Sequence, residues 1–121
     1  MAFIAVARLE DIAPLGARRW RRADGVVIAI FRTADDRVFA LRDRCPHRGG
    51  PLSQGIVFGE SVACPLHNWC IGLADGAAAA PDVGAVERFE ARLEGGTVLL
   101  DPDSGRVEAK ACAAPEAVAT P

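Results

Sequence analysis

Two short segments of the chain each combine a cysteine with a histidine. In CPHRGGPL (45–52), one residue separates Cys45 from His47, and in CPLHNW (64–69), two residues separate Cys64 from His67. The chain has only two histidines among its 121 residues. Thiolate and imidazole are both good ligands for iron and zinc, so these four side chains together predict one metal centre.

The order of the ligands separates the candidate centres. A chance grouping is the bland alternative, because a buried cysteine often acts only as a small apolar residue. A structural zinc is a second alternative, but common zinc fingers pair like ligands, whereas each segment here contributes one of each type. A binuclear iron–sulfur cluster fits the mixture better, with both thiolates on one iron and both imidazoles on the other. Gly49 and Gly50 would let the backbone approach such a cluster closely.

The pattern C-x-H, sixteen residues, then C-x-x-H resembles the Rieske signature, and the resemblance spans nearly the whole chain. It implies an all-β Rieske fold, with a β-sandwich or barrel base and a small cluster-binding subdomain at about residues 43–72. It also implies that Cys45, His47, Cys64 and His67 bind a 2Fe-2S cluster, with both histidines coordinating through Nδ1. We expect one domain over residues 1–109 and a mobile tail over residues 110–121.

The elements that must position these ligands are short strands. Branched and aromatic runs bounded by turn residues predict eight to ten strands, and no stretch of ten residues has a helical period. Each ligand pair follows a strand signal, so both pairs are expected on loops at strand ends. The strand-like runs are Phe3–Leu9, Gly25–Thr33, Arg37–Leu41, GIVF (55–58), SVA (61–63), CIGLA (70–74), AVERFEARL (85–93) and TVLL (97–100).

The resemblance also separates branches of the Rieske family. Quinol-oxidising members have an extra cysteine in each ligand loop, where this chain has Gly50 and Leu66, so that disulfide cannot form. They also hydrogen-bond the cluster through a serine and a tyrosine, where this chain has Trp69 and Ile71. Fewer donors to the sulfurs leave the reduced cluster less stabilised, so we expect a low reduction potential.

Two branches without a membrane anchor remain. CPHRGGPLSQGIV and CPLHNW resemble the small subunit of assimilatory NAD(P)H-dependent nitrite reductase, and the alternative is a ferredoxin that feeds aromatic-ring dioxygenases. The first resemblance implies a large partner subunit that carries FAD, a 4Fe-4S cluster and sirohaem, and that reduces nitrite to ammonium. No G-x-G-x-x-G follows a strand here, so we expect this chain to be a relay or accessory subunit without catalytic residues of its own.

Composition limits the partners and the location. The net charge of −2 gives no case for nucleic acid, and no apolar run is long enough to cross a bilayer. The amino terminus does not resemble a secretory leader, so we expect a cytoplasmic protein. Cys70 and Cys112 are expected to be a packed residue and a tail thiol rather than ligands.

The expected docking surface surrounds the two histidines. Arginine mixed with apolar side chains suits a protein interface. ARRWRR (17–22) is interpreted instead as an edge strand with solvated arginines. The residues expected to contribute to the docking surface are Arg44, Arg48, Pro51, Leu52 and Trp69.

Overall fold

The computed structural model describes residues 3–44, 51–65, 70–78 and 84–107. This part of the chain contains nine strands and two short 3-10 turns, which confirms the all-β prediction. The predicted tail over residues 110–121 lies outside the described residues. The elements are β1 (Ile4–Arg8), η1 (Leu9–Asp11), β2 (Ala17–Arg21), β3 (Val27–Arg32), β4 (Val38–Arg42), η2 (Leu52–Gln54), β5 (Ile56–Phe58), β6 (Ser61–Ala63), β7 (Cys70–Gly72), β8 (Arg88–Glu94) and β9 (Thr97–Arg106).

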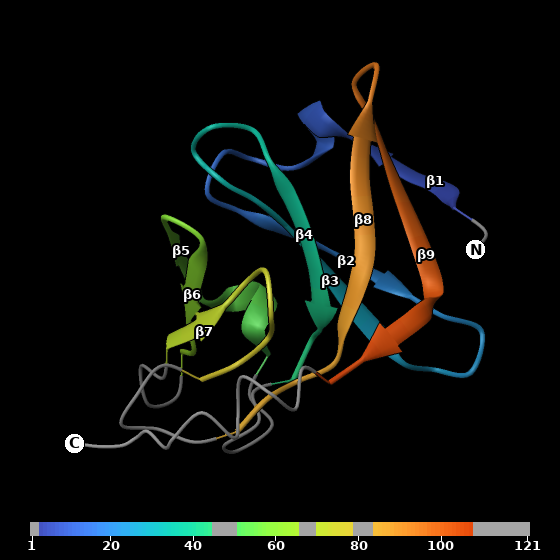
Figure 1. Cartoon of the computed structure of the whole chain (residues 1–121). Coiled ribbons are helices and arrows are strands. Elements are labelled where there is room, and N and C mark those ends of the chain that lie inside the picture. Colours follow the sequence, from blue (N-terminus) through green and yellow to red (C-terminus); the bar gives the residue numbers. More distant parts are fainter. Residues whose placement is uncertain (1–2, 45–50, 66–69, 79–83, 108–121) are drawn as a thin grey trace.

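The strands form two antiparallel sheets, which lie beside each other (Figure 1). The larger sheet has the order β1-β9-β8-β4-β3-β2, and the smaller one has the order β5-β6-β7. Between β4 and β5 the chain forms η2, which contacts β2 and β3 of the larger sheet. The small sheet is therefore inserted in the chain between β4 and β8, which pair directly with each other in the larger sheet.

Strand β3 is buried on both faces, which explains its nearly continuous apolar sequence. Ala29 and Phe31 face a core shared with the small sheet, and Ile28 and Ile30 face a second core within the larger sheet. All four side chains are 0% exposed. A strand that is covered on both sides does not alternate between apolar and polar residues. β3 thus joins the two cores of the molecule.

The last strand is longer than the sequence predicted. The predicted strand TVLL ends at Leu100, but β9 continues to Arg106. A bulge makes this possible, because the pairing with β8 shifts between Arg88 and Glu90. The Ser104 hydroxyl accepts the Glu90 N–H at 2.7 Å and donates to the Asp101 carbonyl at 2.7 Å. The Ser104 side chain thus takes the place of the backbone carbonyl that would otherwise accept the Glu90 N–H, and the sequence pattern does not reveal this replacement.

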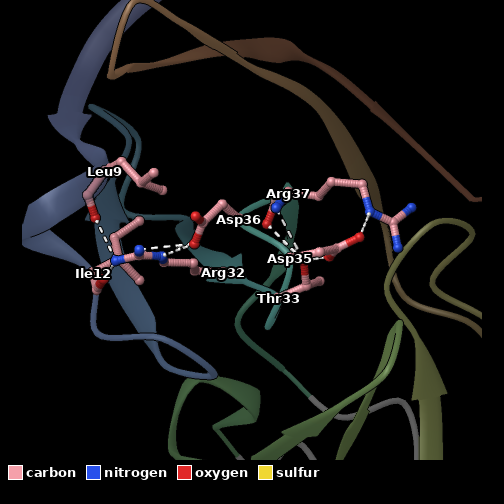
Figure 2. A network of polar contacts seen from close by, with 7 residues as sticks. All are labelled: Leu9, Ile12, Arg32, Thr33, Asp35, Asp36 and Arg37. Carbon is pink, nitrogen blue, oxygen red and sulfur yellow. Dashed lines mark hydrogen bonds and ion pairs between the residues drawn. The ribbon is translucent and has the colours of Figure 1, made fainter.

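One arginine ties the β3–β4 hairpin to the segment after β1 (Figure 2). Arg32 donates to the carbonyl oxygen of Ile12 at 2.7 Å and pairs with Asp36 at 2.8 Å. Asp36 has a φ of 65°, the left-handed conformation that aspartate tolerates better than most residues. The turn between the two strands is thereby held from outside the hairpin.

The same turn contacts the small sheet. Arg37 forms an ion pair with Asp35 at 3.0 Å (Figure 2). It forms a second ion pair, at 2.6 Å, with Glu60 in the turn between β5 and β6. A hydrogen bond from the Thr33 hydroxyl and the charge of Arg37 lower the pKa of Asp35. Hydrogen bonding to Glu60, with the charge of Asp35, raises the pKa of Arg37. This ion-pair network links the hairpin of the larger sheet to the small sheet.

Strand β2 is the edge strand that the sequence predicted, but its arginines are not simply solvated. Arg19 pairs with Asp43 at 2.8 Å. Arg22, just after β2, donates to the Pro102 carbonyl at 2.7 Å and pairs with Asp24 at 2.9 Å. The interpretation of ARRWRR as solvated was therefore wrong for these two residues. Asp43 and Pro102 are distant in sequence from these arginines, so local pattern could not identify them as partners.

Candidate metal centre

One of the four predicted ligands belongs to the described part of the chain. Cys64 follows β6 directly and is 1% exposed. Cys45, His47 and His67 lie outside the described residues. Among the described residues, no three His, Cys, Asp or Glu side chains come together as a metal site. The site is accordingly characterised by Cys64 and by the segments that flank the two ligand pairs.

Cys64 is packed in an apolar environment. It belongs to the core that joins the two sheets, together with Leu52, Val62, Ile71 and Leu73. These four neighbours are almost fully buried. A thiol in such surroundings is shielded from water, which suits a ligand whose metal should not exchange with solvent. The position fits the thiolate ligand that a 2Fe-2S cluster requires.

The two ends of the second ligand segment are held side by side. Ala63 pairs with Cys70, and Val62 pairs with Ile71, in the antiparallel β6–β7 ladder. The chain between Cys64 and Cys70 therefore leaves and returns at adjacent strands. Cys70 is half-buried on β7 rather than in the core centre. Such a hairpin fixes the base of the segment that contains His67.

The end of the first ligand segment meets the beginning of the second. Leu52, two residues after Gly50, is buried in the same core as Cys64. Ile56 then pairs with Ala63 in the β5–β6 ladder. Gly55 crosses Ala63 so closely that an added Cβ would lie 2.2 Å from the Ala63 carbonyl oxygen. The two flanks are thus in direct contact beside Cys64.

The need for glycine at position 55 was not predicted. Gly49 and Gly50, inside the ligand segment, were the glycines expected to matter, and Gly55 was expected only as the first residue of a strand. Its role follows from the close approach of two strands, which appears only in the folded chain. The pairing of GIVF with SVA was the available signal, because Ile56 pairs with Ala63 and the same antiparallel register places Gly55 opposite Cys64.

The expected docking surface needs one correction. Leu52 was predicted to supply exposed apolar surface, but it is 0% exposed. Its side chain belongs to the core that also contains Cys64, Val62 and Ile71. Arg44 is exposed and Pro51 is half-buried, as a surface role requires. Arg48 and Trp69 lie outside the described residues.

The family of the domain that contains these flanks follows from its match to a family model. Residues 2–90 match the model of the Rieske [2Fe-2S] domain. The chain belongs to the Rieske [2Fe-2S] domain family. The Rieske fold that the family resemblance implied is confirmed, and the domain implies a 2Fe-2S cluster.

Curated Rieske relatives include proteins of two sizes. Ferredoxin CarAc of Metapseudomonas resinovorans is 28% identical over 102 residues, which cover 81% of this chain and 92% of CarAc. The 4beta-methylsterol monooxygenase of Methylococcus capsulatus is 51% identical over 45 residues, 37% of this chain and 12% of the monooxygenase. The chain spans only 12% to 22% of the length of the first three curated relatives, which are oxygenases.

Solved Rieske structures of similar size include members of both expected branches. The ferredoxin of carbazole 1,9a-dioxygenase from Nocardioides aromaticivorans superposes with a TM-score of 0.73 at 26% identity, over 85% of this chain and 100% of that one. The E. coli protein NirD has a TM-score of 0.73 at 28% identity, over 85% and 98%. A structure assigned to the NADH-dependent nitrite reductase small subunit of Mycobacterium tuberculosis has a TM-score of 0.74 at 23% identity, over 88% and 96%, and shows the shared fold.

Within the described residues of this Rieske protein, no helix is both long enough and apolar enough to span a bilayer.

Proposed function

We propose that this chain is the small Rieske iron–sulfur subunit of assimilatory NAD(P)H-dependent nitrite reductase, a cytoplasmic enzyme that reduces nitrite to ammonium. In this proposal Cys45, His47, Cys64 and His67 hold a 2Fe-2S cluster. Such a cluster accepts and releases one electron at a time. The chain then acts as a one-electron relay or as an accessory subunit.

The observation that carries the ligand set is the convergence of the two segments beside Cys64. Gly55 contacts Ala63, and Ala63 pairs with Cys70, so the flanks of both cysteine–histidine pairs meet at one end of the small sheet. A binuclear cluster that takes one thiolate and one imidazole from each segment needs this convergence. Leu52 is buried in the same core as Cys64, so the flanks of both segments share an apolar base.

The work of catalysis is assigned to a partner. Reduction of nitrite to ammonium takes six electrons, a nicotinamide delivers two as hydride, and one Rieske cluster carries a single electron. The proposed large subunit supplies FAD, a 4Fe-4S cluster and sirohaem. Support for this partner comes from CPHRGGPLSQGIV and CPLHNW and from the similarity to NirD at 28% identity over 98% of its length.

A second candidate is a ferredoxin that delivers electrons to an aromatic-ring dioxygenase. The observation in its favour is the alignment with ferredoxin CarAc, which covers 92% of that protein. A structure described as a complex of oxygenase and ferredoxin in carbazole 1,9a-dioxygenase also superposes, with a TM-score of 0.75 at 26% identity. The two candidates differ in the partner and in how long it stays bound.

Co-purification separates the two candidates. A nitrite reductase subunit should remain with a large sirohaem-containing chain through gel filtration, and Arg48→Glu and Arg44→Glu should weaken that complex. Arg18→Glu is the matched control for this change of charge. Arg19 of β2 pairs with Asp43, next to Arg44, whereas Arg18 precedes Arg19 on the strand and so points to the opposite side of the sheet. Absence of a complex, together with efficient electron transfer to an oxygenase, would favour the ferredoxin instead.

A further inference from the structure

A buried carboxylate lies at the base of the first ligand segment. Asp43 accepts a hydrogen bond from the Ser53 backbone N–H and another from the Ser53 hydroxyl, both at 2.7 Å. Arg19 of β2 completes the set with an ion pair at 2.8 Å. The side chain of Asp43 is 0% exposed, whereas that of Arg19 is 55% exposed. The acidic partner is thus enclosed, and the basic partner reaches it from the surface.

These contacts close the chain around the first ligand pair. Asp43 lies two residues before Cys45, and Ser53 lies six residues after His47. A side-chain bridge between Asp43 and Ser53 therefore joins the two ends of the segment that contains both ligands. The backbone N–H of Asp43 also donates to the Val27 carbonyl at 2.9 Å, which fixes the entry of the segment to β3. The bridge anchors the segment to the rigid larger sheet.

The chemistry of the bridge favours one geometry. A buried carboxylate is costly unless its oxygens are satisfied, and here two donors from Ser53 and one from Arg19 supply that compensation. Charge-assisted hydrogen bonds of this kind are short and directional. If the segment shifts, the carboxylate loses its donors while it stays buried. The bridge therefore penalises displacement of either end of the ligand segment.

We propose that Asp43 is a positioning residue for the metal centre: with Ser53 and Arg19 it holds the segment of Cys45 and His47 in the arrangement that binds the cluster. This inference rests on the proposed ligand set. Residues that orient metal ligands from behind commonly change metal affinity by 10–100-fold when replaced. Asp43 acts through the ligand segment and is not itself a ligand in this proposal.

The test compares cluster loss among variants of the purified holoprotein. Cluster release to an iron chelator is followed by the decay of visible absorbance, and the free energy of unfolding of each variant is measured separately. Asp43→Asn places an amide against the donors of Ser53 and Arg19, so we expect release to be faster by roughly 10-fold. Ser53→Ala should also accelerate release, whereas Ser53→Thr, which keeps the hydroxyl and the N–H, should restore the wild-type rate.

Asp101→Asn is the matched control. Asp101 is another buried aspartate, 3% exposed, and it lies on β9 of the larger sheet. Its replacement should lower the free energy of unfolding but leave the rate of cluster release in the folded protein within about twofold of wild type, since the Asp101 carboxylate accepts a hydrogen bond from the Asp103 N–H of its own strand. Arg19→Lys, which keeps a cation near Asp43, should release the cluster more slowly than Arg19→Gln.

A spectroscopic readout distinguishes positioning from stability. In Asp43→Asn protein that still holds its cluster, the histidine nitrogen couplings in the electron paramagnetic resonance spectrum should shift, and in Asp101→Asn they should not. Equal release rates for Asp43→Asn and Asp101→Asn, with unchanged couplings, would overturn this inference alone. A wild-type protein without iron and sulfide would overturn the ligand set and this inference together.

Discussion

Gly55 and Ala63 approach so closely that a Cβ on Gly55 would lie 2.2 Å from the Ala63 carbonyl oxygen and 2.9 Å from a methyl group of Val62. The backbone of Gly55, with φ of −81° and ψ of −178°, is one that any residue can adopt. The requirement for glycine is therefore steric. It keeps the end of one ligand segment against the residue that precedes Cys64.

Gly55→Ala should disturb cluster binding more than the fold. The added methyl group must push β5 away from β6, at a cost of about 1–3 kcal/mol in the free energy of unfolding. Gly59→Ala is the control in the same hairpin, because an added Cβ there would meet no atom within 4 Å. Since Gly59 has a φ of +55°, this substitution also destabilises the fold, by about 1–2 kcal/mol of left-handed backbone strain. Iron content per chain should fall for Gly55→Ala only. Equal iron content in both variants would contradict this account of the Gly55 contact.

The ionisation of Asp35 should make part of the stability depend on acid pH. The hydrogen bond from Thr33 and the charge of Arg37 lower its pKa in the folded protein. The stabilisation is complete above the ordinary pKa of an aspartate and is lost as pH falls through the lowered value. Asp35→Asn should therefore be less stable than wild type at neutral pH, and the difference should narrow in acid.

Thr33 offers a direct check on the cause. Thr33→Val removes the hydroxyl that donates to Asp35 and should move the pKa of Asp35 back toward its ordinary value, whereas Thr33→Ser keeps the donor. An NMR titration of the Asp35 carboxyl group measures each value. A wild-type pKa at or above the ordinary one would show that the network does not favour the ionised form.

The cysteines outside the proposed ligand set should be dispensable for the cluster. Cys70 is half-buried on β7, opposite Ala63, and Cys112 lies outside the described residues. We expect Cys70→Ala and Cys112→Ser to retain full iron and sulfide by chemical analysis. Loss of the cluster in either variant would mean that the ligands have been misassigned, with Cys64→Ser as the positive control for loss.

The reduction potential should lie in the lower part of the roughly −150 to +300 mV Rieske range. The positions that carry a serine and a tyrosine in quinol-oxidising relatives are Trp69 and Ile71 here, and Ile71 is 0% exposed within the core around Cys64. The hydrocarbon side chain of Ile71 cannot donate a hydrogen bond to a sulfur. Protein-film voltammetry measures the potential, and a value near the top of the range would contradict this explanation.

Local pattern was enough to predict much of the architecture. Strand runs such as Gly25–Thr33 and Arg37–Leu41 contain β3 and most of β4, because buried branched residues are read directly from sequence. The bulge of β9 was not predictable, since Ser104 replaces a backbone partner and resembles a turn residue. Leu52 looked like surface beside a ligand, and only the packing of two sheets shows it to be buried.

The ligand chemistry of the candidate site could be predicted from the sequence, but the contacts that hold the ligand segments in place could not. The types and spacing of Cys45, His47, Cys64 and His67 indicate a mixed thiolate–imidazole centre without a structure. The bridge from Asp43 to Ser53 depends on η2 folding back onto β2 and β3. Arg19, which completes that bridge, comes from a strand far away in sequence. Such long-range partners leave no periodic signal.

The most direct test of the central claim is an electron paramagnetic resonance spectrum of the reduced protein, combined with iron and sulfide analysis. If the two cysteines and two histidines share a 2Fe-2S cluster, the spectrum has Rieske-type g values with couplings to histidine nitrogens, and two irons and two sulfides are bound per chain. A protein that contains one zinc and neither iron nor sulfide would contradict the account.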